Sequence, residues 1–181
     1  KGNRTPIALV VGSGGGHNFA IALRDAVLRT TWSAPGRYSN RRGYTDVNHT
    51  ISLYDGFDIT YNQGTTSKPN TDYGSPIKAE NPNFKACYAA AHYQSGASLS
   101  GNIAHSRWFL PGLGEWSLAF KTFGTKPLSN GVYNKWEDYE DNLKYQRVQI
   151  LFKQAGGEPV NTYYWSADMR GSTIYTVVIR D

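Results

Sequence analysis

Residues 30–82 show almost no helix or strand periodicity. This segment is rich in Gly, Asn, Thr, Ser and Tyr, and its one short apolar stretch lies at 51–54. Segments of this length without regular structure are uncommon inside a compact domain, where they are mostly functional loops or linkers. The aromatic residues in the segment favour ordered loops. Regular elements must therefore come from the flanking regions, which predicts a loop-rich α+β fold with short helices and few strands.

The N-terminal region contains a glycine run, Gly12–Gly16, after an apolar stretch. We expect a strand at 6–11, a turn over the glycines and a helix at 18–29 with Asn18 as its N-cap. Such a turn resembles a phosphate-binding loop, but the spacing differs. His17 stands where a dinucleotide-binding fingerprint needs glycine, and no Gly-Lys-Ser/Thr is present. We therefore expect a plain turn between a strand and a helix.

The rest of the chain predicts three helices and two strands. Asn81-Pro82 is a helix-start signal, followed by an apolar stripe that extends to about Tyr93. A short helix is expected at 111–123. The spacing of Val148, Leu151, Phe152 and Ala155 predicts an amphipathic helix with Gly156-Gly157 as its C-cap. Residues 163–166 and 173–180 are expected strands, whereas 124–147 is an expected loop with a helical turn near Trp136. We also expect the first and last strands to pair.

Length and composition favour one domain over residues 1–181, as part of a longer exported protein. Hydrophobic residues make up 39% of the chain and aromatic residues 14%, including 13 Tyr and 5 Trp. Aromatic side chains of this kind are favoured in binding surfaces, although many of them also fill a small core. The net charge of +5 is scattered, so no nucleic-acid partner is expected. No apolar run is long enough for direct membrane insertion.

The sequence contains no catalytic constellation that we can identify. The four histidines lack metal-ligand spacing, so no metal or cofactor is expected. Cys87, the only cysteine, lies on an apolar stripe and is expected to be a buried small hydrophobe. Asp55 and Asp58 form the only pair considered for glycosidase chemistry, and sequence distance does not fix their separation in space. The chain is therefore not expected to be an enzyme.

Four segments resemble, in their order and spacing, the Lcl C-terminal-domain family of bacterial surface domains. They are Gly16–Ala26, Tyr54–Thr60, Ser106–Trp116 (SRWFLPGLGEW) and Ala155–Asp168, the last containing Tyr164-Trp165-Ser166. The variant with the Tyr-Asp-Gly segment is similar to domains of fimbrillin-like cell-surface proteins. The resemblance spans nearly the whole chain.

The resemblance implies a C-type-lectin-like fold: a small twisted antiparallel sheet with paired terminal strands, flanking short helices and long loops that form the ligand face. It also implies core roles for Trp108, Leu110, Trp116 and Trp165, and a helix that starts at Pro111. Calcium-binding members carry Glu-Pro-Asn and Trp-Asn-Asp motifs, whereas this chain has Glu158-Pro159-Val160 and Trp165-Ser166-Ala167-Asp168, which lack Asn at the key positions. Calcium is therefore not expected. Related formylglycine-generating enzymes need several cysteines, which argues against that activity.

The expected function is that of a non-enzymatic binding or adhesion domain at the extracellular or outer-membrane surface. Its partner would be a glycan or protein, or other surface or fimbrial subunits, and would meet the loops at 33–80, 95–106 and 124–147. The candidate ligand-binding residues are Tyr61, Tyr73, Trp136 and Tyr139. Packing inside the loop is the alternative role for each. The alternative functions are a structural or tip module of a fimbria-like assembly and a carbohydrate-active enzyme that uses loop carboxylates.

Overall fold

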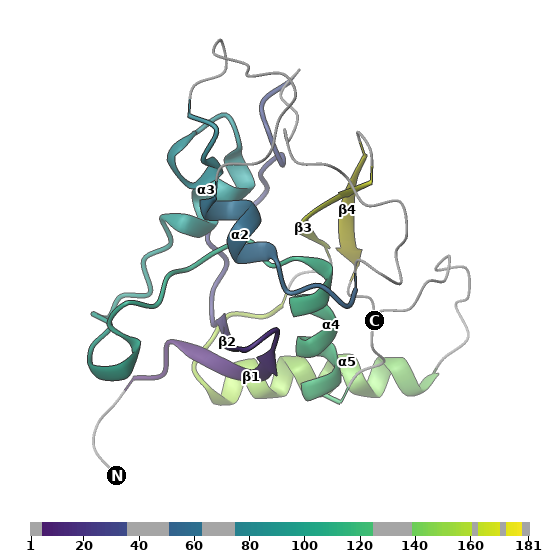
Figure 1. The fold of residues 1–181 in the computed structure, drawn as a ribbon. Helices are drawn as coiled ribbons and strands as arrows, with labels where there is room; N and C mark the ends of the chain where they lie inside the picture. Colours follow the sequence, from purple (N-terminus) through teal and green to yellow (C-terminus); the bar gives the residue numbers. More distant parts are fainter. Residues whose placement is uncertain are drawn as a thin grey trace.

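The computed structural model describes residues 5–35, 51–62, 75–124, 139–160, 163–170 and 173–178. Over this part the chain is α+β, with two separate two-stranded antiparallel sheets (Figure 1). The elements are β1 (Ala8–Gly14), β2 (His17–Ala22), α2 (Gly56–Tyr61), η2 (Lys78–Glu80), α3 (Lys85–Ala91), η3 (Gly101–Ile103), α4 (Leu113–Thr122), α5 (Tyr139–Gln154), β3 (Tyr163–Arg170) and β4 (Thr173–Val178).

The glycine run is the turn of a β-hairpin, so the prediction of a helix at 18–29 is wrong. Gly15 and Gly16 have φ of 57° and 82° and connect β1 directly to β2. Positive φ at both central residues is the mark of the two-residue hairpin turn whose twist matches that of the strands. Asn18 is therefore a strand residue that pairs with Ser13, and it caps no helix. The apolar stripe expected on a helix face belongs partly to a strand.

The other helix predictions are largely confirmed. The expected helix at 111–123 is α4, although it begins at Leu113 and not at Pro111. The amphipathic helix is α5, which ends at Gln154, two residues before Gly156 with its φ of 78°, but it starts as early as Tyr139, inside the expected loop. The helix expected after Pro82 is α3, which begins at Lys85. Within its described residues, segment 30–82 contains two short elements that its composition did not predict, α2 and η2.

The expected pairing of the first and last strands is absent from the part of the chain that the structure describes. In the described residues β1 pairs with β2, and β3 pairs with β4, in two sheets that share no strand. A two-residue turn brings its two flanking strands together at a low entropic cost of loop closure. Pairing the first strand with the last would require closure of a loop that spans nearly the whole chain, at a higher entropic cost. Helix α4 lies against β1 and also touches both β3 and β4, so it stands between the two sheets (Figure 1).

Two hydrophobic clusters hold the elements together. The larger joins the hairpin, α4 and α5 through buried side chains such as Val11, Trp116 and Phe152. The smaller consists of Trp32, Phe84, Ala86 and Cys87. Of the four expected core residues, Trp116 is buried, whereas Trp108, Leu110 and Trp165 are half-buried.

Two indole hydrogen bonds connect the smaller cluster to β3. Trp32 Nε1 donates to the Ser166 carbonyl at 3.0 Å, and Trp165 Nε1 donates to the Thr30 carbonyl at 2.8 Å. These bonds join segments more than 130 residues apart in sequence. Within the described residues, no helix has both the length and the apolar character needed to cross a membrane.

Candidate functional site

Three carboxyl groups from distant segments meet at the start of α4. They belong to Asp55, just before α2, to Glu115 in the first turn of α4, and to Asp168 on β3. All three are buried, with exposed fractions of 9%, 5% and 1%. We call this group the carboxylate cluster. It unites three of the four segments on which the family resemblance rests.

Glu115 joins the first residues of two helices. Its Oε1 accepts the N–H of Gly56 at 3.0 Å, and its Oε2 accepts the N–H of Gly112 at 3.0 Å. Gly56 is the first residue of α2, and Gly112 is the N-cap of α4. The first N–H groups of a helix have no partner within it, and the positive end of the helix dipole favours a carboxylate there. One side chain thus stabilises two helix N-termini.

Asp168, on β3, accepts a hydrogen bond from the same end of α4. Its Oδ2 accepts the N–H of Leu113 at 2.5 Å and the hydroxyl of Ser166 at 3.3 Å. The Ser166 hydroxyl also accepts the N–H of Asp168 at 3.2 Å. Strand β3 is therefore joined to α4 by the hydrogen bond from Leu113 to a carboxylate oxygen, and bonds to a charged acceptor are stronger than neutral ones.

The glycines in these segments permit the close approach of the chains. A Cβ at Gly56 would lie 2.5 Å from the backbone nitrogen of Gly112, and a Cβ at Gly112 would lie 2.8 Å from Asp168 Oδ2 and 2.9 Å from Glu115 Oε2. No side chain fits at either place without displacement of backbone or of buried carboxylates. The Tyr-Asp-Gly segment and the Pro-Gly-Leu-Gly segment are therefore in close backbone contact where they cross.

Burial raises the pKa of Glu115 to about 7, since desolvation outweighs the hydrogen bonds to its oxygens, and the charges of Asp55 and Asp168 raise it further. The described residues contain no group of three or more His, Cys, Asp or Glu side chains arranged to hold a metal ion, so this cluster does not match a metal site. Its geometry suits the joining of α2, α4 and β3.

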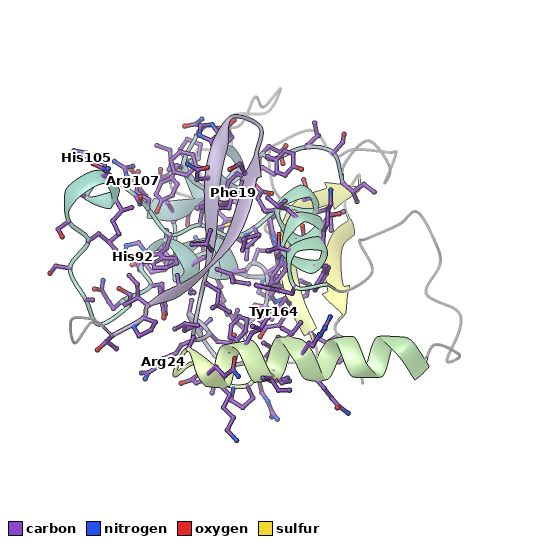
Figure 2. The ribbon with its side chains drawn as sticks, turned by 90° about the horizontal axis from the view of Figure 1, so that it is seen from below. Phe19, Arg24, His92, His105, Arg107 and Tyr164 are labelled. Atoms are coloured by element: carbon purple, nitrogen blue, oxygen red, sulfur yellow. The ribbon has the colours of Figure 1, made fainter. Side chains whose placement is uncertain are left out.

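A second feature is a run of aromatic rings in mutual contact on α2, the hairpin and the segment before α4. We call it the aromatic strip. Its members are His17, Phe19, Tyr54, Phe57, Tyr61 and Phe109, with Arg107 at one end. Figure 2 shows Phe19 on the hairpin, and Arg107 and His105 on the segment that follows η3.

The contacts of the strip form an unbroken chain. Phe19 stacks on Tyr54 with ring centroids 5.9 Å apart, and it meets the Phe109 ring edge-on at 6.1 Å. Phe109 contacts Phe57 at 5.8 Å, and Phe57 contacts Tyr61 at 4.8 Å. These separations lie in the range in which aromatic pairs attract beyond the burial of their area. The Phe57 side chain remains 38% exposed.

Hydrogen bonding and glycine contacts fix the rings in place. The Tyr61 hydroxyl donates to the Trp108 carbonyl at 2.7 Å. A Cβ at Gly14 would collide with the Tyr54 ring, so the glycine lets that ring lie directly on the hairpin. The glycine run thus has two roles: it forms the hairpin turn, and it leaves room for the Tyr54 ring to pack against the backbone at Gly14.

Arg107 provides positive charge at one end of the strip. Its guanidinium carbon lies 5.2 Å from the centre of the Tyr61 ring, and its side chain is exposed. Burial raises the pKa of the Tyr61 hydroxyl, and the nearby Arg107 charge partly opposes that rise. Tyr61 therefore stays a neutral donor at physiological pH.

Of the four candidate ligand-binding residues, only Tyr61 has a described side chain, and it lies on α2 and not in a loop. Tyr139 is the first residue of α5, which corrects its assignment to a loop, but its side chain lies outside the described residues. Tyr73 and Trp136 lie outside the described residues altogether. The helical position of Tyr61 explains its contact with Phe57, because residues four apart share one helix face.

The two carboxyl groups of the candidate catalytic pair have different environments. Asp55 is buried in the carboxylate cluster, whereas Asp58 is exposed and accepts a hydrogen bond from Asn62 at 2.8 Å. Cys87 is fully buried, as expected, and burial raises the pKa of its thiol to about 12.

Sequence reasoning did not single out Glu115 or Asp168, nor the strip residues Phe57, Phe109 and Arg107. A partial signal was available for the first two: Glu115, like Asp55, stands next to a glycine, and Asp168 follows Ser166 by two residues. Phe57 and Tyr61 also have the spacing of a helix face. No local pattern links Phe19 to Phe109, because their contact depends on the tertiary fold.

Comparison with known proteins adds no family to this description. No protein-family model, no curated protein and no solved structure matches the chain.

Proposed function

We propose that this chain is a non-enzymatic binding domain of a cell-surface protein, and that its ligand docks on the aromatic strip. The observation that carries the proposal is the unbroken run of ring contacts from His17 to Tyr61, partly exposed at Phe57 and ending at the Arg107 guanidinium. The motif resemblance supports a C-type-lectin-like architecture and a place on the bacterial surface. Both remain parts of the proposal.

Preorganisation is the physical reason to favour the strip as a binding surface. Binding costs the conformational entropy of each side chain that it orders, and here the rings are already held by one another and by hydrogen bonding. Aromatic side chains also offer a large contact area with few rotatable bonds. The apolar ring faces suit the C–H face of a sugar or an apolar side chain, and Arg107 and His17 supply polar contacts at the two ends.

The test is an array of glycans and host-matrix proteins probed with the purified chain, with and without calcium. Phe57→Ala should reduce a specific signal about tenfold or more, as expected for a central anchor. Tyr163→Ala is the matched control, because Tyr163 is an exposed aromatic residue (62%) on β3, outside the strip. It should leave the signal unchanged, and calcium should have no effect.

Two results would contradict the proposal. One is equal binding by wild type and by a folded Phe57→Ala variant. The other is a blank array from well-folded protein, which would favour the structural or fimbrial role. That role predicts self-assembly, which light scattering would detect.

A further inference from the structure

Helix α2 connects the carboxylate cluster to the aromatic strip. Its first residue, Gly56, donates its N–H to Glu115, and the following residues of the same helix include Phe57 and Tyr61 of the strip. The helix has only six residues, so its position depends on what holds its ends. Thr60, in its last turn, accepts the N–H of Leu110 at 3.3 Å, which ties α2 to the segment that carries Phe109. The carboxylate cluster and the aromatic strip are therefore connected through the backbone of α2.

Within the described residues, the two charges that act on the Glu115 carboxyl group are both negative. Asp55 and Asp168 approach Glu115 from the start of α2 and from β3, and their charges act on it in the same sense. Oxygens of all three groups lie within 3.3 Å of the position of a Cβ on Gly112. On the neighbouring η2 and α3, the Lys78 amine lies 5.5 Å from the Phe84 ring centre, and its charge acts on Cys87.

We propose that the Asp55–Glu115–Asp168 cluster is a proton-dependent link between α4 and α2. Uptake of one proton fixes the position of α2 against the start of α4, and with it the positions of the Phe57 and Tyr61 rings. The importance of this link for ligand recognition rests on the proposed function. The link itself does not rest on the proposed function, since it concerns only the chain's own residues.

The direction of the effect follows from the geometry. Ionisation of Glu115 adds a negative charge beside the Asp55 and Asp168 carboxyl groups in a poorly solvated space, and the repulsion that these two groups exert on Glu115 opposes the close crossing of α2 and α4. One proton held among the oxygens removes a charge and leaves the backbone N–H groups their acceptors. The raised pKa of Glu115, about 7, places this change near neutral pH. Acidification from pH 8 to pH 6 should therefore order α2.

The experiment is an NMR titration of the full chain from pH 5 to pH 9. The Gly56 and Gly112 amide signals and the Phe57 and Tyr61 ring signals should shift together, with one midpoint near pH 7. Glu115→Gln should abolish the shared transition. Asp58→Asn, which removes an exposed carboxylate from the same helix, should leave it in place.

Asp55→Asn provides a second test that does not depend on the folding of Glu115→Gln. Loss of one repelling charge should move the shared midpoint to lower pH. Separate midpoints for Gly56 and Gly112, ring signals that do not follow them, or a transition that survives in folded Glu115→Gln would overturn the link. A blank ligand array with an intact titration would contradict the proposed function alone, and the reverse pattern would contradict the link alone.

Discussion

Glu115 makes the stability of this chain depend on pH. Its pKa rises from 4.5 to about 7 on folding. Between these values the folded chain keeps a proton that the unfolded chain has lost, so the free energy of unfolding decreases as pH rises. Below 4.5 both states hold the proton and above 7 neither does, so this contribution is flat there. The total loss is roughly 3 kcal/mol.

Denaturant unfolding at several pH values between 4 and 8 measures this decrease. Glu115→Gln should remove the part of the slope between pH 4.5 and 7. Glu158→Gln is the matched control, because Glu158 is exposed and its only described ion pair, with Arg24, is 4.0 Å long. A slope that is unchanged in Glu115→Gln would show that another group controls the pH dependence.

Cys87 should be chemically silent in the folded chain. Its side chain is fully buried, and burial raises the pKa of the thiol to about 12, so little thiolate forms at neutral pH. We expect a thiol-reactive dye to label native protein only as fast as the chain opens, and to label denatured protein at once. Rapid labelling in native buffer would mean that Cys87 lies outside the core.

At the level of elements, the β1–β2 turn has a specific backbone requirement. Gly16 has φ of 82°, and a Cβ added there would meet open space, so conformation and not crowding limits substitution. Gly16→Val should cost about 1–2 kcal/mol, because branched residues avoid the left-handed region. Gly16→Asn should change stability by less than about 0.5 kcal/mol, since Asn is common in such turns.

Thermal or denaturant unfolding of both Gly16 variants measures the difference. Equal stability of the Val and Asn variants would contradict the hairpin, because a flexible connection from a strand to a helix would tolerate both. The same pair of variants therefore tests the correction to the helix expected at 18–29.

For the whole molecule, the packing of α5 against the hairpin and α4 should decide stability. Phe152 is 5% exposed and contacts Phe123 with ring centroids 6.1 Å apart. Phe152→Ala should lower the free energy of unfolding by about 3–5 kcal/mol. Ile150→Ala, on the same helix but 51% exposed, should change it by less than about 0.5 kcal/mol.

Denaturant titration followed by Trp fluorescence and by circular dichroism checks this prediction. The two probes should report one coincident transition, because β3 packs against the larger cluster through Tyr164 and against the smaller one through Trp165, and indole hydrogen bonds join it to Thr30 and Trp32. Two separate transitions, or a small effect of Phe152→Ala, would show that α5 contributes little to a common core.

Local sequence patterns are sufficient to define those elements whose residues repeat with a strong period. The apolar spacing of Val148 and Phe152 and the glycines after Ala155 define the C-terminal part of α5 but not Tyr139–Arg147, and Leu113, Trp116 and Phe120 define α4. The burial of Cys87 also follows from its helical stripe. Each of these signals lies within a few residues of chain, so periodicity alone reveals it.

The pairing of strands and the composition of the candidate sites, in contrast, depend on tertiary packing. The apolar residues between Phe19 and Leu23 fit a helix face or a strand equally well, and the two-residue turn with its partner strand settles the choice. Asp55, Glu115 and Asp168 are more than 50 residues apart from one another, as are Phe19 and Phe109. Their meeting depends on how the elements pack, because burial, close glycine contacts and charge repulsion act through space and leave no periodic trace along the chain.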